Sequence, residues 1–378
     1  MVDVDPPQGG RARTERAPAR SRVAGERLAA CKPQGAAGGP AKPAPRRLLG
    51  AGAGTPRSAT RWLAWVFFGA ALVFAGVAAL LGDVFFFRLA TEALIFGGLA
   101  LSVDILLGRT GLLPLGQALF FGFGAYVSAL VLKQVTPSFW LALAVVLVSA
   151  TLAGLAAGMI AIRAKGVYFA LISFGLAQVV SKVVFNTREL GASDGIIGVP
   201  VPQISLGLVS VDAAHAPSFF LLVLGAMGAL YAVLAWLMDT PFGRQLAAIK
   251  ANESRVPFLG FDPWRYKLAA FVLAANVAAL SGAFYPMLRG FVSPELMFFQ
   301  VSGSAIINVI VGGTGTLVGP LYGAAILTLL KSVVGSFTAH HQIVIGVLFV
   351  VSVIFFPKGL VGYLAPALER RWKRKEVS

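Results

Sequence analysis

A succession of long apolar segments, almost free of charged residues, constrains this chain more than any other feature of its sequence. Each segment holds about 20 residues, the length that a helix needs to cross a hydrocarbon core about 30 Å thick. Of the 378 residues, 57% are hydrophobic and only 13% are charged, against about 25% charged in soluble proteins. The apolar residues run continuously instead of alternating, so the sequence predicts an all-α, polytopic transmembrane helical bundle and not a barrel. The ten expected spans are 62–82, 89–107, 112–132, 139–162, 166–185, 218–238, 268–288, 298–313, 319–336 and 341–357.

The distribution of basic residues predicts how the bundle is oriented. Ten spans bring both chain ends to one side of the membrane, and Lys and Arg accumulate in cytoplasmic loops. With cytoplasmic termini, the short inner loops hold eight Lys and Arg residues and the outer connections hold four. We therefore expect the N and C termini in the cytoplasm. The orientation of the bundle in the membrane then explains much of the net charge of +16, and nucleic-acid binding is not needed to explain it.

The first 61 residues differ in composition from the rest of the chain. They hold 12 Lys and Arg against 4 Asp and Glu, with few large apolar side chains, so we expect a disordered basic tail. They lack the apolar core of a secretory signal peptide, although their Arg-rich composition resembles an organellar transit peptide. We interpret them as a cytoplasmic tail that touches anionic lipid or as an over-extended gene start. Residues 62–366 form the expected transmembrane domain, and residues 367–378 a basic C-terminal tail.

Ionisable residues are missing from the middles of the expected spans. A charge at the bilayer centre costs about 3 kcal/mol or more, and one that persists there commonly marks a proton or ion path. Glu92, Asp104, Lys182 and Lys331 lie near span ends, where we expect each side chain to reach toward water. A proton-coupled transporter is therefore disfavoured, whereas a sodium-coupled one that uses backbone carbonyls stays open.

The sequence also lacks the groups that catalysis or nucleotide hydrolysis would need. The GGTGT stretch at residues 312–316 has no P-loop lysine, and its glycines are typical of close helix packing. One cysteine and three histidines accompany no carboxylate cluster, so we expect no metal and no cofactor. No nucleophile–base pair lies at membrane depth, which disfavours a membrane enzyme. Uphill transport would then draw its energy from another chain.

A polar inner connection, residues 239–267, carries its own amphipathic pattern. Pro241 suits the first turn of a helix, and Gly260 suits a C-terminal cap. Pro257 predicts that the helix ends or kinks near Arg255. Such a helix can lie on the lipid surface or dock into a partner's groove, and the pattern alone does not separate these. The residues expected along one helical face are Phe242, Leu246, Ile249 and Val256.

Few neutral polar side chains lie inside the expected spans. Such residues commonly join helices by hydrogen bonds. A path for a small polar solute would also have to use them. We select Gln117, Asn276 and Asn308 as candidates for that path.

Five segments resemble the permeases of branched-chain amino-acid ABC importers. GRTGLLPLGQALFFGFGAY at residues 108–126 is similar to the family's GxxGLxSLGHAAFFGIGAY signature. The other four follow in family order, so that the matches run through roughly the last three quarters of the chain, and they favour the M-type permease. They are KGVYFALISFGLAQVV with GASDGIIGVP at 165–200, the segment 241–272, VIVGGTGTLVGPLYGAA at 309–325 and FFPKGLVG at 355–362.

The resemblance implies a permease subunit, with no enzymatic activity of its own, in a bacterial inner membrane. It implies a pore formed with a second homologous permease subunit, two ATP-binding subunits beneath, and an extracytoplasmic solute-binding protein. It also favours partner docking over lipid contact for residues 239–267, which would be the cytoplasmic coupling loop. The implied ATPase-coupling residues are Leu246, Ile249, Glu253, Arg255 and Gly260.

Three departures from the family pattern bear on the solute and on the loop. Pro114 stands where the family has Ser, and Gln117 where it has His. Both lie in the expected pore segment, so urea or short amides are alternatives to branched-chain amino acids. Val256 and Pro257 replace an Ala-Glu pair and bend the coupling segment.

Overall fold

A computed structural model describes residues 57–337, apart from 82, 206–209 and 213–214, and then 343, 346–347, 350 and 359–364. The first nine expected spans, apart from residue 82, and the whole inner connection 239–267 lie within these residues. Nearly all of the basic tail expected over residues 1–61 lies outside them, as do the tail 367–378 and most of the tenth expected span, 341–357.

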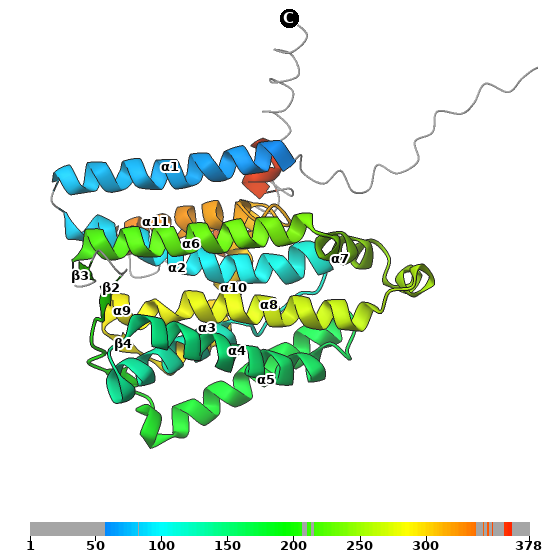
Figure 1. Ribbon diagram of the computed structural model, residues 1–378, viewed down its shortest axis with the longest axis horizontal. Coiled ribbons are helices and arrows are strands. Elements are labelled where there is room, and N and C mark those ends of the chain that lie inside the picture. The colour runs from blue at the N-terminus through cyan, green and yellow to red at the C-terminus, as the bar shows by residue number, and fades with distance from the viewer. Residues whose placement is uncertain are drawn as a thin grey trace, which may run out of the picture. The chain divides into compact units, whose positions relative to one another are not determined.

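The described chain is almost entirely helical, and eight of its helical segments are long and apolar enough to cross a membrane. A ninth helix, α10, is apolar but has only 14 residues. Together they account for the first nine expected spans, and the predicted polytopic helical bundle is confirmed (Figure 1). The spanning helices are α1 (Arg57–Leu81), α2 (Val84–Asp104), α3 (Gln117–Leu130), α4 (Phe139–Ala161), α5 (Val167–Asn186), α6 (Ala216–Asp239), α8 (Pro263–Ala283) and α11 (Gly319–Phe337), with α10 at Phe299–Gly312.

Short irregular helices extend several of these spans. Two π-helices continue α2 and α3: η1 (Ile105–Thr110) and η2 (Val131–Val135). The five-residue helix α9 (Tyr285–Arg289) follows α8 directly. Two 3-10 turns, η3 (Arg188–Leu190) and η5 (Pro294–Met297), lie in the connections that follow α5 and α9.

Three helices, α2, α3 and α8, form the buried centre of the bundle (Figure 1). The backbones of α3 and α8 touch, because a Cβ on Gly124 would lie 2.1 Å from the carbonyl oxygen of Ala279. Gly282 makes the reciprocal approach, 1.9 Å from the carbonyl oxygen of Phe121. In lipid, where burial gives little drive for association, such close packing of small residues is what holds helices together. By contrast, only about a third or less of α1, α4, α5 and α6 is buried.

Connections between helices form two groups at opposite ends of the spans. In one group, β1 (Ile196–Ile197) pairs antiparallel with β4 (Phe291–Val292), and Lys133 Nζ donates to the Ile197 carbonyl at 2.9 Å. Glu92 and Arg289 form an ion pair of 2.7 Å there. A second antiparallel pair joins β2 (Gln203–Ser205) to β3 (Ser210–Asp212). These are the connections expected outside, and we call this end the outer end.

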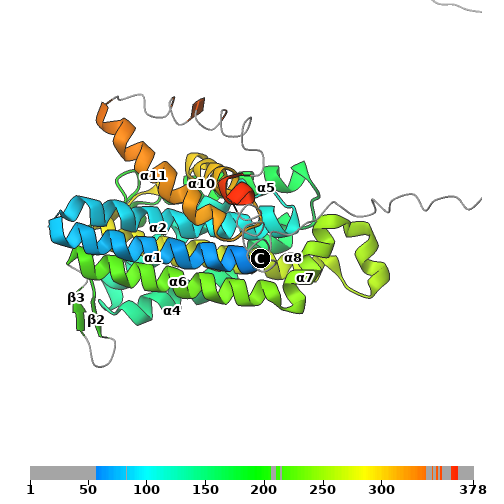
Figure 2. The same cartoon turned by 90° about the horizontal axis from the view of Figure 1, so that it is seen from above.

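The inner end holds the connections that were expected to face the cytoplasm. There the start of α1 meets the end of α6 through an ion pair between Arg61 and Asp239. Between α6 and α8 the chain forms α7 (Pro241–Ala251) and then the 3-10 helix η4 (Glu253–Leu259). Both views show these two elements reaching past the neighbouring helices (Figures 1 and 2).

Candidate coupling surface and solute path

The helix α7 is anchored to the bundle by the apolar face that the sequence predicted. Leu246 and Ile249 on α7 are at most 3% exposed, and Val256, expected on the same helical face, is buried in η4 instead. Gly243 lets α7 fold back against the end of α6, since a Cβ there would lie 2.2 Å from the Met238 carbonyl oxygen. The predicted break comes early, because the helix ends at Ala251 instead of continuing to the neighbourhood of Arg255.

The turn after α7 is held in place by one buried cation. Lys267, near the start of α8, contacts Glu253 with a Nζ–Oε2 distance of 2.5 Å. The Lys267 side chain is 4% exposed and that of Glu253 is 37% exposed. Gly260, with φ of 81°, then ends η4 in the left-handed conformation expected of a capping glycine. Glu253 therefore has an intramolecular partner that the sequence did not indicate.

Two apolar side chains project from the end of this turn into solvent. Phe258 is 90% exposed and Leu259 is 66% exposed. Such an exposed pair on an anchored turn is available for contact with a partner protein or with a membrane surface. Of the five expected coupling residues, Leu246 and Ile249 are buried beneath the turn. Arg255 and Gly260 are exposed on the turn, and Glu253 is partly buried.

The helical pattern could not have identified Phe258 and Leu259, since they follow Pro257 and leave the face set by α7. Their position after Pro257, outside the helical spacing, gave no signal that separated them from the neighbouring apolar residues Val256 and Phe261. We define the coupling surface as Arg255, Phe258, Leu259 and Gly260.

Asp104 corrects an expectation from the sequence. Its side chain does not reach toward water, because the residue is fully buried. It accepts backbone hydrogen bonds from Gly315 at 2.5 Å and from Leu317 at 3.1 Å. The burial follows from the loop between α10 and α11, which folds over the end of α2. The glycines of the GGTGT stretch allow the loop to come this close to the end of α2, in keeping with the close packing predicted for them.

A polar cluster surrounds the first turn of α3. Gln117 is 1% exposed, and its Nε2 has no hydrogen-bond partner within the described part of the chain. Beside it, Ser173 on α5 accepts from the Leu115 amide at 3.2 Å, and Ser302 on α10 accepts from the Ala118 amide at 2.9 Å. Helices α3, α5 and α10 therefore bring hydroxyl and amide groups together. One amide donor, Gln117 Nε2, has no partner within the described residues.

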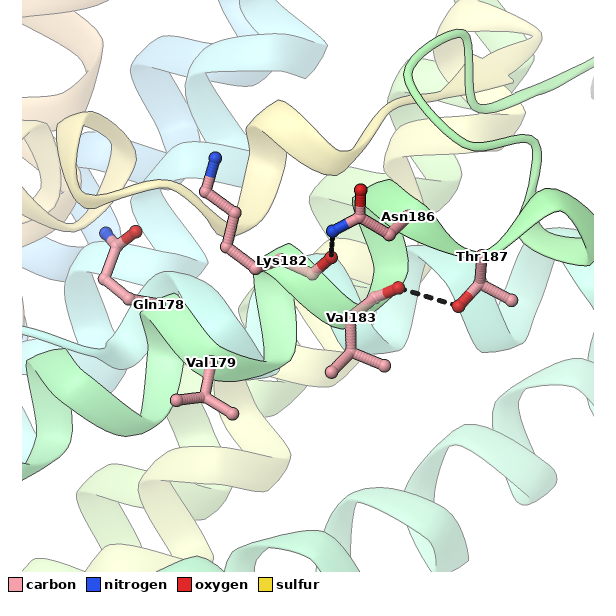
Figure 3. A pocket seen from close by; sticks show the side chains of 6 residues that line it. All are labelled: Gln178, Val179, Lys182, Val183, Asn186 and Thr187. Carbon is pink, nitrogen blue, oxygen red and sulfur yellow. Dashed lines mark hydrogen bonds between the residues drawn. The ribbon is translucent and has the colours of Figure 1, made fainter.

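A second group of polar side chains lies on α5, nearer the outer end than Ser173. Gln178, Lys182 and Asn186 recur every fourth residue, which places them on one side of the helix. They line an open pocket of about 660 Å³. Figure 3 shows these three side chains directed to one side of α5, with the valines of the same pocket on the other. Asn186 donates to the Lys182 carbonyl at 2.9 Å.

The two other path candidates have different surroundings. Asn276 joins α8 to α4, since it accepts from Thr151 Oγ1 at 3.1 Å and donates to the Val272 carbonyl at 2.9 Å. Asn308 is 6% exposed, and its backbone carbonyl is the point where Gly323 of α11 crosses α10. No described hydrogen bond joins either residue to Gln117.

Comparison with known proteins gives a consistent picture. The family described as "Branched-chain amino acid transport system / permease component" matches residues 85–353. The high-affinity branched-chain amino acid transport system permease protein LivM of Escherichia coli strain K12 is 29% identical over 302 residues, 74% of this chain and 71% of the relative. A ribose import permease protein, RbsC of Haemophilus influenzae, is 24% identical over 278 residues, 67% of this chain and 75% of the relative.

A more distant relative is the probable branched-chain amino acid transport permease protein LivM of Methanocaldococcus jannaschii. It is 24% identical over 169 residues, 43% of this chain and 47% of the relative. No solved structure matches the chain. The family match spans the bundle from the start of α2 and includes α7, η4 and the polar cluster around Gln117. This multi-pass membrane protein thus belongs to the branched-chain amino acid transport permease family, as a permease component and not as an enzyme.

Proposed function

We propose that the chain is the transmembrane permease subunit of an ATP-driven importer in a bacterial inner membrane, with branched-chain amino acids as its solute. The observation that carries this proposal is the coupling surface, an exposed apolar pair on a turn anchored at the inner end. A permease without its own nucleotide site needs such a contact, because the energy for uphill transport must enter from another subunit. Two ATP-binding subunits are the partners that fit.

The coupling surface would dock in a groove of the ATP-binding subunit. Phe258 and Leu259 supply apolar area, and Arg255 lies beside them as a positive group. Leu246 and Ile249 take a supporting role, since they are buried under the turn and hold its position. Glu253 contributes through its ion pair with Lys267.

The polar face of α5 supports the proposal that a second permease subunit packs against this chain. An ammonium group and two amides facing hydrocarbon are costly, so such faces in spans turn to a protein or a water-filled path. A homologous permease against α5 would cover Gln178, Lys182 and Asn186 and enclose a path between the two chains. The solute would enter from an extracytoplasmic binding protein docked at the outer end, and lipid would surround the remaining apolar faces.

Gln117 is the candidate solute contact in this path. Its Nε2, which has no hydrogen-bond partner among the described residues, can donate to a carboxylate or carbonyl oxygen, and Ser302 offers a hydroxyl beside it. A carboxylate fits an amino acid, whereas a carbonyl fits urea or a short amide, and the latter solutes are the alternative. Asn276 and Asn308 remain secondary candidates, because their surroundings favour helix packing.

Co-purification and uptake test the proposal together. The chain is co-expressed with its neighbouring ATP-binding and binding-protein genes, and the Phe258→Ala/Leu259→Ala double variant is compared with wild type. We expect less ATP-binding subunit bound to the variant and lower uptake of radiolabelled leucine in proteoliposomes. Trp65→Ala is the matched control, since Trp65 on α1 is 79% exposed and belongs to neither proposed docking surface. Uptake by the wild-type chain alone, driven by an ion gradient, would overturn the proposal.

A further inference from the structure

The cytoplasmic helix α7 is tied to the end of α2 by one side chain. Lys250, in the last turn of α7, donates from Nζ to the Gly108 carbonyl oxygen at 2.7 Å, across 142 residues of sequence. Gly108 lies in η1, where the wider turn of a π-helix continues α2. A cation is favoured at such a helix end, where backbone carbonyls lack partners and carry partial negative charge. Lys250 also packs over Gly111, which has φ of 76°.

The same short segment holds the loop between α10 and α11 from its other side. Asp104 accepts the amides of Gly315 and Leu317, which lie 211 and 213 residues further along the chain. Gly108 presses against this loop as well, because a Cβ on it would lie 2.6 Å from the Gly315 nitrogen. The loop therefore rests on η1 through close backbone contacts that leave no space for a side chain at Gly108.

Charge links the two contacts. Asp104 is fully buried, and a buried carboxylate is stable only with hydrogen bonds and nearby cations. Arg109 and Lys250 both lie close enough to interact with it electrostatically. Lys250 thus acts on η1 directly through Gly108 and on the loop through the charge of Asp104.

From the loop the contacts continue to the polar cluster. The loop begins at the end of α10, and α10 carries Ser302, which accepts from the Ala118 amide in the first turn of α3. Ser302 and the start of the loop belong to the same short helix, so a shift of that helix would displace Ser302. The path from α7 to Gln117 therefore runs through η1, Asp104, the loop and α10.

We propose that Lys250 and Asp104 are positioning residues that transmit movement of α7 to α10 and so to the solute path. The role in transport rests on the proposed function, but the physical link can be tested on the permease alone. Disturbing Lys250 at one end should loosen the amides of Gly315 and Leu317 at the other, although Lys250 bonds to neither.

Amide hydrogen exchange on the purified full chain in nanodiscs tests this link. Lys250→Met keeps the apolar stem and removes the ammonium, and exchange over residues 313–318 should rise about tenfold, the effect of one lost charged hydrogen bond. Lys250→Arg should restore protection. Arg244→Met is the matched control, since Arg244 is an exposed cation on the same helix and its side chain makes no hydrogen bond or ion pair in the described part of the chain. Asp104→Asn should raise exchange in the same loop directly.

Two exchange outcomes would overturn the inference. One is unchanged protection of residues 313–318 in Lys250→Met, and the other is an equal rise in Arg244→Met. In the complex with its ATP-binding subunits, Lys250→Met should hydrolyse ATP at the wild-type rate yet import about tenfold less solute per ATP. Proportional loss of both activities, with the complex intact, would also contradict it. If the wild-type complex neither assembles nor transports, the proposed function fails, while the exchange result still decides the link.

Discussion

The ion pair between Lys267 and Glu253 allows a quantitative test of how the coupling turn is held. Lys267 is nearly buried, whereas Glu253 can still reach water. Replacing Glu253 by Gln removes the charge opposite Lys267 and leaves the ammonium short of a partner. An unmatched charged group of this kind costs about 1–3 kcal/mol, and solvent access at Glu253 places the loss toward the lower end. Detachment of η4 from α8 should then become about five to thirty times more frequent.

Limited trypsin digestion of the protein in nanodiscs measures this detachment. Arg255 lies in η4 and is exposed, so cleavage after it reports when the turn opens. Glu253→Gln should speed that cut about five- to thirtyfold. Glu253→Lys should speed it more, because two ammonium groups then face each other, and mass spectrometry separates the cut after Arg255 from the cut at the introduced lysine. Cleavage after Arg244 on α7 provides the internal control and should change less.

The charge-swapped double variant, Glu253→Lys with Lys267→Glu, separates the two explanations for Glu253. If Glu253 acts through Lys267, the swap should restore wild-type cleavage and most of the uptake. If Glu253 instead contacts the ATP-binding subunit, the turn should recover and uptake should stay low. Equal cleavage rates in wild type and Glu253→Lys would refute the structural role. In every variant we expect normal membrane insertion, because the pair lies at the inner end.

Further substitutions test the path and the centre of the bundle. Gln117→Leu should leave unfolding in detergent unchanged or improved, because it removes an unpartnered buried donor, and should lower leucine uptake at least tenfold; normal uptake would exclude Gln117 as a solute contact. Gly124→Ala should lower stability by about 1–3 kcal/mol, since its Cβ would collide with the Ala279 carbonyl, and thermal unfolding against Gly175→Ala, which has open space, checks this. Lys182→Met should reduce uptake but strengthen detergent stability of the isolated chain, and an uptake equal to wild type would place the path elsewhere.

The coupling segment shows what a local sequence pattern can predict and what it cannot. The apolar spacing of Phe242, Leu246 and Ile249 predicted a helix with one buried face, and the structure has it. Helical periodicity is a local property, so a single sequence carries it. The role of Glu253 was different, because its partner Lys267 lies in another element and the pairing depends on how α7 folds back onto α8.

By itself, the sequence determined the bundle and its family. Lipid offers no hydrogen bonds, so a chain with nine or ten continuous apolar runs has only helices to adopt. The motif segments then sufficed to indicate a permease. Tertiary structure alone decided that Asp104 is buried under a loop more than 200 residues away, that Phe258 and Leu259 project, and that Gln117 lacks a partner within the described residues. These features depend on contacts between distant segments, and those contacts are set by packing of whole helices, which no local pattern records.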